Sequence, residues 1–223
     1  MYSFFYSKVK NKTITDDLYA HLIKALRFKV GDCFLFFDEQ FEYNCQITKI
    51  EKDKAFYEIL GTNNLVISNP PFITLIQGYP KKDKVDFICK YATMFNVKEI
   101  IFVYMKRSIP IYQYPTIKIQ RLETIIQDAV TLSKRKTVPK VSIVTSIKEI
   151  NYSLFDSVYL CYEEETNKMQ IQRTNNIAII IGPEGGFDLD EVNFLKKYAK
   201  IISLGPNILS TEAASLAVLS LFL

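Results

Sequence analysis

Two turns near the end of the chain decide the fold: one within IAIIIGPEGGFDLDE, residues 177–191, the other within IISLGPNILSTEAASLAVLS, residues 201–220. Each turn opens with Gly-Pro directly after an apolar, strand-like run and leads into a helix-like segment. In open α/β sheets, ligands bind at the carboxyl ends of the strands. The sequence therefore predicts a ligand site where the two turns lie side by side.

Glycine is concentrated in these turns. The chain has only seven glycines in 223 residues, and four of them fall between residues 182 and 205. Glycine is needed where the backbone has a positive φ or where another group approaches closely. Each turn is followed by residues that can begin a helix. Asp188 with Glu191 forms a capping-box pattern, and Ser210 or Thr211 can cap the last helix. The alternative to a ligand site is that both turns need glycine for steric reasons alone.

The turns do not match the common phosphate-binding motifs. No glycine precedes a lysine as the Walker pattern requires, and the spacing of Gly182, Gly185 and Gly186 differs from G-x-G-x-x-G. Neither turn offers a basic side chain to a phosphate. We therefore expect a ligand that is held by backbone groups and apolar contacts, such as an adenosine joined to a small charged tail.

The first part of the chain is rich in short apolar and β-branched runs. One amphipathic helix is expected at residues 16–28, with Leu18, Leu22 and Leu26 at helical spacing. The sequence Asn69-Pro70-Pro71 marks a linker, because prolines cannot pair in a central strand. Residues 1–69 are thus predicted to form a small β domain, with strands at 33–37, 42–50 and 54–60.

Beyond the linker, strand-like runs alternate with helix-like segments. In residues 116–133, Leu122, Ile126 and Val130 belong to one apolar stripe, which is typical of an amphipathic helix. This alternation favours a parallel sheet covered on both faces. We therefore predict an α/β domain at residues 72–223, with strands at 72–78, 99–105, 158–162, 177–181 and 201–204 and helices at 84–95, 116–133, 189–199 and 211–222.

Composition excludes several classes of protein. Hydrophobic residues make up 48% of the chain, which is enough for a packed core. Four scattered cysteines and one histidine, His21, give no zinc-site pattern and favour a reducing, cytoplasmic environment. Histidine-dependent hydrolysis would have to use His21, and no nucleophile motif accompanies it. The first residues lack the apolar core of a signal peptide, and residues 213–223 are too few to span a membrane.

Several segments resemble a known family. IIIGPEGGFDLDE followed by SLGPNILSTEAASLAVLS is similar to the two C-terminal signatures of SPOUT methyltransferases, and in detail to the RsmE family. HLIKALRFKVGD, residues 21–32, resembles that family's PUA-like RNA-binding domain, a small β-barrel. Residues 81–108 resemble its first strand–helix unit, and residues 134–141 its basic loop. The resemblance implies methylation of N3 of a uridine in small-subunit (16S) ribosomal RNA, with S-adenosyl-L-methionine as cofactor.

The resemblance also implies an architecture and a set of cofactor contacts. It implies a SPOUT-type α/β sheet whose C-terminal part is threaded into a trefoil knot, and a homodimer with each active site at the subunit interface. The last helix is apolar nearly all round, which suits burial against knot and partner. A loop around Tyr162 and Glu163 would complete the pocket. The cofactor would contact Tyr162, Ile181, Gly182, Pro183, Glu184, Gly185, Gly186, Leu204, Gly205, Pro206, Asn207, Ile208, Leu209 and Thr211.

Grouped basic residues indicate where RNA would bind. The net charge is only +4, but lysines and arginines gather at a few places and could contact phosphates without reading sequence. Solvated surface lysines are the alternative for any one group. Tyr112 and Tyr114 could stack a splayed base. The expected RNA-binding residues are Lys24, Arg27, Arg107, Lys134, Arg135 and Lys136.

Two glutamates and one of two arginines are expected to take part in the chemistry. N3 of uridine carries a weakly acidic proton, so a base or an anion-stabilising cation should assist its methylation. With no histidine nearby in sequence, Glu184 and Glu212 are the candidate bases, and Arg107 or Arg135 would stabilise the uridylate. A structural role at helix ends is the alternative for both glutamates.

Two other functions stay open. The family usually has arginines where this chain has Asn207 and Ser210, so one alternative is a degenerate member that binds ribosomal RNA without methylating it. The other is a SPOUT methyltransferase that acts on a different RNA, such as tRNA. In the preferred interpretation the partners are the small ribosomal subunit and a second copy of the chain, with no membrane and no metal.

Overall fold

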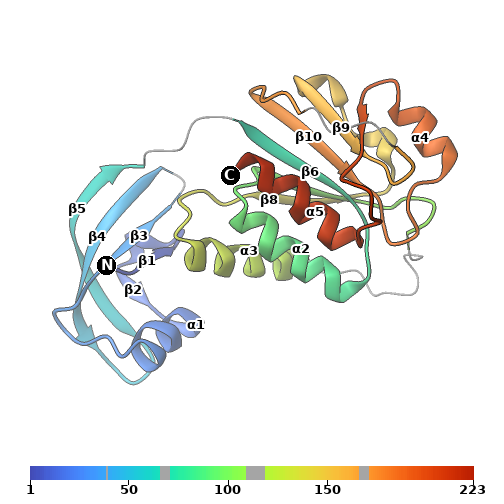
Figure 1. The fold of residues 1–223 in the computed structure, drawn as a ribbon. Coiled ribbons are helices and arrows are strands. Elements are labelled where there is room, and N and C mark those ends of the chain that lie inside the picture. Colours follow the sequence, from blue (N-terminus) through green and yellow to red (C-terminus); the bar gives the residue numbers. More distant parts are fainter. Residues whose placement is uncertain (39, 66–70, 109–118, 166–170) are drawn as a thin grey trace. The chain divides into compact units, whose positions relative to one another are not determined.

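The computed structural model describes residues 1–38, 40–65, 71–108, 119–165 and 171–223 (Figure 1). The chain divides into two compact units, Met1–Ile67 with Val130–Thr137 and Ser68–Ala129 with Val138–Leu223. The expected linker residues Asn69 and Pro70 lie outside the described residues. No feature of the sequence indicates that residues 130–137 group with the first unit.

The first unit is built on a five-stranded sheet with an aromatic core. Its strand order is β1-β3-β4-β5-β2, with β1 parallel to β3 and the other pairs antiparallel. Phe34, Phe36 and Tyr57 are buried together, with ring centroids 4.8 to 5.9 Å apart. The three expected strands are confirmed. The strands are β1 (Ser3–Phe5), β2 (Thr13–Ile14), β3 (Cys33–Phe37), β4 (Phe41–Ile50) and β5 (Ala55–Asn64).

The helix that forms within residues 16–28 differs from the expected one in its type and in the residue at which it ends. A short α-helix, α1 (Asp16–Tyr19), passes directly into a π-helix at Ala20–Ala25. The Leu26 N–H accordingly donates to the His21 carbonyl, five residues back, at 2.9 Å. Arg27 then takes a φ of 59°, which no helix continues through. The predicted helix is therefore confirmed in position but wrong in geometry and length.

The second unit contains a six-stranded parallel sheet. Its order is β11-β9-β10-β6-β7-β8, so the two central strands are β10 and β6. Residues 177–181 of β10 are all buried, which explains the unbroken apolar run. Because the strands are parallel, the turns after β9, β10 and β11 all lie at one edge. The strands are β6 (Phe72–Gly78), β7 (Glu99–Val103), β8 (Lys140–Val144), β9 (Ser157–Cys161), β10 (Asn176–Ile181) and β11 (Lys200–Ile202).

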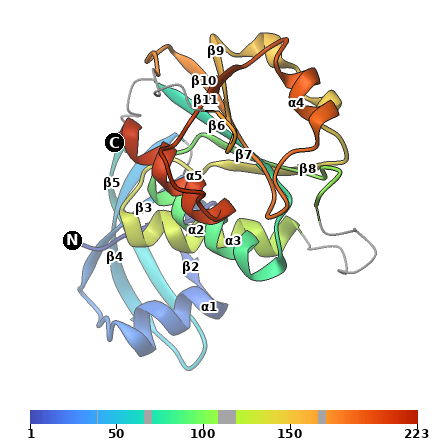
Figure 2. The ribbon, with the colours of Figure 1, turned by 45° about the vertical axis from the view of Figure 1, so that its right-hand side comes forward.

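Helices cover both faces of this sheet (Figures 1 and 2). On one face α2 (Lys82–Met94) and α5 (Thr211–Leu219) pack against each other. On the other, α4 (Leu189–Leu195) contributes Val192 and Leu195 to a core that includes Ile180. The α/β class with a parallel sheet is thus confirmed. The remaining helices are α3 (Ile119–Ser133) and 3-10 turns at Val9–Asn11, Ile147–Glu149, Tyr152–Leu154 and Ser220–Phe222.

In the described part of the chain, no helix is long and apolar enough to cross a membrane. The same residues contain no group of three or more His, Cys, Asp or Glu side chains placed to hold a metal ion.

Candidate functional site

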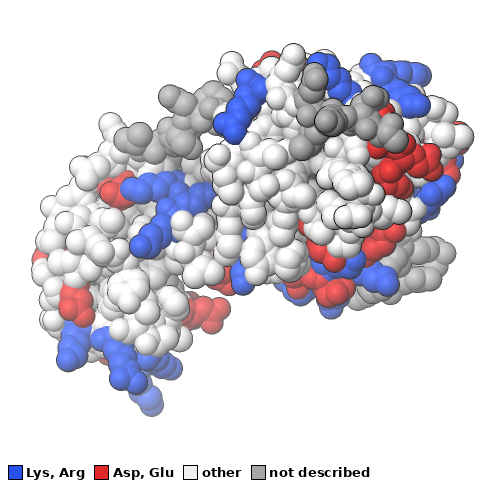
Figure 3. Space-filling view, in the orientation of Figure 1, with Lys and Arg blue, Asp and Glu red and all other residues white. Residues whose placement is uncertain are grey.

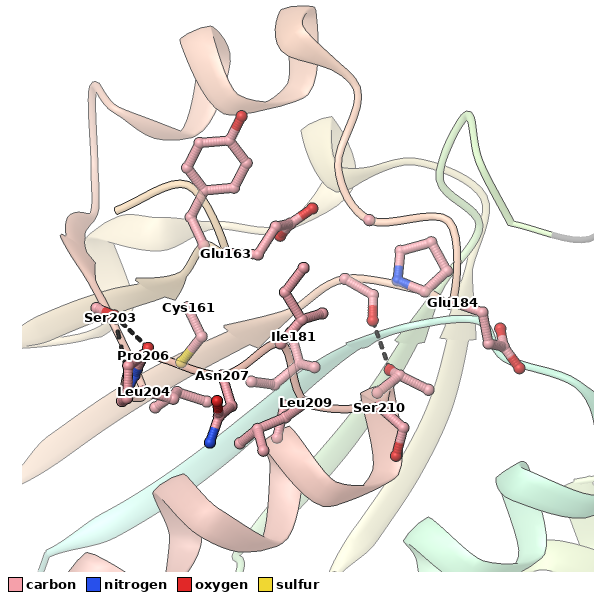
Figure 4. A pocket seen from close by; sticks show the side chains of 18 of the residues that line it. Cys161, Glu163, Ile181, Glu184, Ser203, Leu204, Pro206, Asn207, Leu209 and Ser210 are labelled. Atoms are coloured by element: carbon pink, nitrogen blue, oxygen red, sulfur yellow. Dashed lines mark hydrogen bonds between the residues drawn. The ribbon is translucent and has the colours of Figure 1, made fainter. Parts of the chain in front are cut away.

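A pocket of about 360 Å³ opens at the carboxyl edge of the parallel sheet (Figure 4). It lies among the turns that follow β9, β10 and β11, so the two Gly-Pro turns do meet. Every residue expected to contact the cofactor lines it except Gly185. The lining is Lys84, Cys161, Tyr162, Glu163, Ile181, Gly182, Pro183, Glu184, Gly186, Ser203, Leu204, Gly205, Pro206, Asn207, Ile208, Leu209, Ser210, Thr211 and Ala214.

A buried polar network joins the two turns. Gln77, at the end of β6, is fully buried, and its Nε2 donates to Thr211 Oγ1 at 2.7 Å. The Thr211 hydroxyl in turn donates to the carbonyl of Gly182 at 2.5 Å. The single Ser215 hydroxyl hydrogen is shared between Gln77 Oε1, 2.6 Å from Oγ, and the Thr211 carbonyl, 2.8 Å from Oγ. The start of α5 is thereby fixed to the first residue of the other Gly-Pro turn.

The adjacent glycines of the first turn are needed for close approach. A Cβ at Gly185 would lie 3.0 Å from Arg107 Cβ, and Arg107 Nη1 donates to the Gly185 carbonyl at 3.2 Å. Gly186 has a φ of 69°, and a side chain there would overlap the Glu163 carboxylate. The Gly-Gly pair therefore brings a cation and an anion against the same turn, where any other residue would push them away.

Lys84 connects both glutamates that were expected to act as bases. Its Nζ lies 2.8 Å from Glu212 Oε2 and 3.7 Å from Glu184 Oε1. Glu184 also accepts a hydrogen bond from the Lys81 backbone N–H at 3.0 Å. Burial alone would raise the pKa of Glu212, but the hydrogen bonds from Lys84, the Glu212 backbone and Ser210, together with the charge of Lys84, outweigh it and leave that pKa lowered. Glu212 does not line the pocket, and Glu184 extends away from its centre (Figure 4).

Lys106 fixes the loop after β7 beside the first Gly-Pro turn. Its Nζ donates to Asp188 Oδ1 at 2.8 Å and to Asp190 Oδ2 at 2.6 Å, and its backbone N–H donates to Glu191 Oε1 at 2.8 Å. Asp188 and Glu191 form the predicted capping box at the start of α4. These bonds hold Arg107, the next residue, against the turn.

Two family models match the chain. One is described as an RNA methyltransferase domain and matches residues 68–223; the other is described as an RNA methyltransferase PUA domain and matches residues 14–60. The chain belongs to the RNA methyltransferase family. The β-rich first unit is thus of PUA type, as the resemblance implied, and the pocket lies in the methyltransferase domain.

Relatives of this RNA methyltransferase cover nearly its whole length. The Bacillus subtilis protein named ribosomal RNA small subunit methyltransferase E is 27% identical, over 93% of this chain and 88% of the relative. Its Rickettsia conorii namesake is 29% identical, over 93% and 87%. The solved structure of the Neisseria gonorrhoeae protein of that name, bound to S-adenosyl methionine, is 25% identical, with a TM-score of 0.83 and coverage of 100% of this chain and 96% of that one.

The residues of the methyltransferase that were expected to bind RNA differ in accessibility. Lys24, Arg27 and Lys134 are exposed in the first unit. Lys136 is also exposed and forms an ion pair with Glu42. Arg135 is half-buried and donates to Thr137 Oγ1 at 2.9 Å, and burial lowers its pKa to about 10. Tyr112 and Tyr114 lie outside the described residues.

Several pocket residues of the methyltransferase were not foreseen. Lys84 comes from α2 and reaches the pocket only because α2 packs on α5. Cys161 ends β9, and burial raises the pKa of its thiol, which therefore stays neutral. Gln77, which does not line the pocket but joins its two turns, had a signal in the sequence, since an amide at the end of an otherwise apolar strand must find buried partners. Ser203, Ser210 and Ala214 adjoin predicted residues along the chain.

Proposed function

We propose that this RNA methyltransferase uses S-adenosyl-L-methionine to methylate N3 of a uridine in small-subunit ribosomal RNA, in the cytoplasm. Relatives over nearly the full chain carry the small-subunit name, and one was solved with S-adenosyl methionine. The observation that carries the proposal is the pocket formed by both Gly-Pro turns and joined through Thr211 and Gly182.

The pocket residues fit an adenosyl methyl donor. Ile181, Leu204, Pro206 and Leu209 supply apolar surface for a purine, and the neighbouring turns supply backbone N–H and C=O groups for its edges. S-adenosylmethionine supplies an activated methyl group on a sulfonium. We include in the proposal that the turns belong to a trefoil knot. The strand order supports it, because β11 pairs with β9 rather than with β10, which precedes it.

Arg107 is the residue to which we assign stabilisation of the uridylate. It is exposed, and it lies against Gly185 in the turn that borders the pocket. A cation there lowers the free energy of the anion that forms as N3 loses its proton. Glu184 and Glu212 are the proposed bases, although their contacts with Lys84 also suit a structural role. Much of the rate would come from orienting the base and the methyl donor.

The proposal also includes contacts with RNA and with a second subunit. Lys24, Arg27, Arg107, and residues 134–136 would contact phosphates of ribosomal RNA. A homodimer is supported by the surface over α5, which carries few charges (Figure 3), and by apolar side chains left in solvent near it. Ile208 is 83% exposed and Leu223 73% exposed. Apolar groups of this size are usually covered in an assembly.

The test uses purified protein, small ribosomal subunits that lack the modification, and S-adenosylmethionine labelled in its methyl group. We expect label in ribosomal RNA and a new reverse-transcription stop, since a methyl on N3 blocks the Watson–Crick edge. Label found only in tRNA would favour the alternative substrate. Binding of ribosomal RNA with no detectable binding of S-adenosylhomocysteine would favour the non-methylating alternative and reject this proposal.

A further inference from the structure

One carboxylate of the pocket has no protein partner in the described part of the chain. Glu184 and Glu212 are both engaged by Lys84. Glu163, two residues beyond β9, lines the same pocket, and no hydrogen bond or ion pair of its carboxylate is found among the described residues. Its carboxylate lies against Gly186, and in Figure 4 the Glu163 side chain lies above Ile181 while that of Glu184 points away from the other labelled residues. A carboxyl group in such a position is suited to hydrogen-bond donors on a ligand.

The place of Glu163 in the sheet indicates which donors those are. β9 and β10 are parallel neighbours, with Cys161 opposite Ile181. The acidic residue and the glycine turn therefore follow adjacent strand ends. In dinucleotide-binding folds an acidic side chain beyond the end of the strand next to the glycine turn binds the ribose hydroxyls. Here the G-x-G-x-x-G motif is absent and the acid precedes the glycine turn in the sequence, but both again follow the carboxyl ends of adjacent parallel strands.

We infer that Glu163 accepts hydrogen bonds from the ribose hydroxyls of the adenosyl methyl donor. The inference rests on the proposed function, because it requires that donor in the pocket. Apolar side chains from the second Gly-Pro turn, among them Leu204 and Leu209, line the hollow together with Glu163 (Figure 4). A nucleoside in this pocket can place its purine on the apolar side and its sugar at the carboxylate.

Gly186 supports this role. Because a side chain at Gly186 would overlap the Glu163 carboxylate, glycine leaves that carboxylate room in its present position. The carboxylate offers one oxygen to each hydroxyl of a cis-diol, and hydrogen bonds to an ionised acceptor are stronger than those between neutral groups. Glu163 would thus recognise the sugar, while the chemistry of methyl transfer takes place elsewhere in the pocket.

The experiment measures ligand affinity by calorimetry for the unaltered full chain, for Glu163→Gln and for the control Glu58→Gln. The control removes the same charge from an exposed residue of β5 that does not line the pocket. The ligands are S-adenosylhomocysteine, 5′-methylthioadenosine, which keeps the diol but lacks the amino-acid tail, and the 2′-deoxy form of 5′-methylthioadenosine. We expect Glu163→Gln to bind the first two ligands about tenfold more weakly, by a similar factor for each, and Glu58→Gln to change either affinity by less than about twofold.

The 2′-deoxy ligand tests the same contact without relying on the fold of a variant. The 2′-deoxy ligand should bind the unaltered protein about tenfold more weakly than 5′-methylthioadenosine does. In Glu163→Gln the affinities of these two ligands should differ by less than that. A loss confined to S-adenosylhomocysteine would assign Glu163 to the α-ammonium group and overturn the inference. If Glu163→Gln binds the ligands as the unaltered protein does but transfers the methyl group more slowly, Glu163 acts as a base and the inference is overturned. If the unaltered protein binds neither S-adenosylhomocysteine nor 5′-methylthioadenosine, the proposed function itself fails.

Discussion

Replacing Thr211 by valine should loosen the joint between the two Gly-Pro turns. The Thr211 hydroxyl accepts from Gln77 Nε2 at 2.7 Å and donates to the Gly182 carbonyl at 2.5 Å. These groups lie in the interior, since Thr211 is 5% exposed and Gln77 is fully buried. Valine has nearly the shape of threonine but lacks the hydroxyl, so the substitution removes two buried hydrogen bonds with little change in packing.

The expected loss follows from those two bonds. Each contributes about 1 kcal/mol net, so Thr211→Val should cost about 2 kcal/mol of unfolding free energy. The cost stays moderate because Gln77 Nε2 keeps the carbonyls of Gly78 and Gly182 as acceptors. Thr211→Ser keeps the hydroxyl and removes one buried methyl group, which costs about 1 kcal/mol. For a chain of this size, about 2 kcal/mol corresponds to a fall in melting temperature of about 4 to 8 °C.

The assay is thermal unfolding followed by circular dichroism, together with calorimetric titration of S-adenosylhomocysteine. Thr211→Val should melt below Thr211→Ser and should bind the ligand several-fold more weakly, because the two halves of the pocket are no longer held in register. Thr211→Ser should bind nearly as the unaltered protein does. The reasoning is refuted if Thr211→Val melts within about 1 °C of the unaltered protein, or if the serine variant is equally destabilised.

Three further predictions concern residues around the pocket. Lys84→Met should lower the free energy of unfolding by about 1 kcal/mol at pH 7. Because the pKa of Glu212 is lowered in the folded protein, its contact with Lys84 stabilises the fold fully above pH 4.5, the ordinary pKa, and this stabilisation is lost as the pH falls through the native pKa. Urea unfolding near pH 3 should therefore show a smaller difference between Lys84→Met and the unaltered protein. Gly186→Ala should weaken S-adenosylhomocysteine binding about tenfold, whereas Gly31→Ala, also at positive φ but with open space around it, should leave that affinity unchanged; equal losses would contradict this. Arg107→Ala should slow methyl transfer about tenfold or more while the affinity for S-adenosylhomocysteine changes less than threefold, and an unchanged rate would remove Arg107 from the chemistry.

The buried strands could be predicted from the sequence with little error. β6 occupies Phe72–Gly78, the residues expected, and β10 begins one residue before the expected 177–181. Each is a mostly apolar run that ends at or just before a glycine, and a run of that kind is stable only when both faces are covered. β1 and β2 were missed because three and two residues are too few to show a period.

The helix at residues 16–28 shows where periodicity fails. Leu18, Leu22 and Leu26 recur every four residues, a spacing that suits an α-helix and does not reveal a π segment. Which carbonyl accepts each N–H is decided by contacts that the spacing does not contain. The π-helix at Ala20–Ala25 and the positive φ of Arg27 therefore depend on tertiary structure.

The residues of the site likewise fall into those that the sequence predicts and those that depend on tertiary structure. Residues that belong to the two turns could be named from sequence, because glycines in a glycine-poor chain mark backbone with special demands. Lys84 could not, since it reaches the pocket only through the packing of α2 against α5. The closeness of Glu163 to Gly186 likewise depends on β9 and β10 being neighbours, which the order of strands along the chain does not establish.

Gln77 shows that part of this information was present in the sequence. A side-chain amide at the carboxyl end of a strand as apolar as FITLIQG is expected to be buried, and buried amides are almost always hydrogen-bonded. Its partners have to arrive from other segments at the same sheet edge, and the hydroxyl that follows the second Gly-Pro is a candidate. The observed bonds to Thr211 and to the carbonyl of Gly182 are of this kind, one from each turn. A lone buried amide at a strand end therefore predicts not only its own burial but also which loops must meet around it.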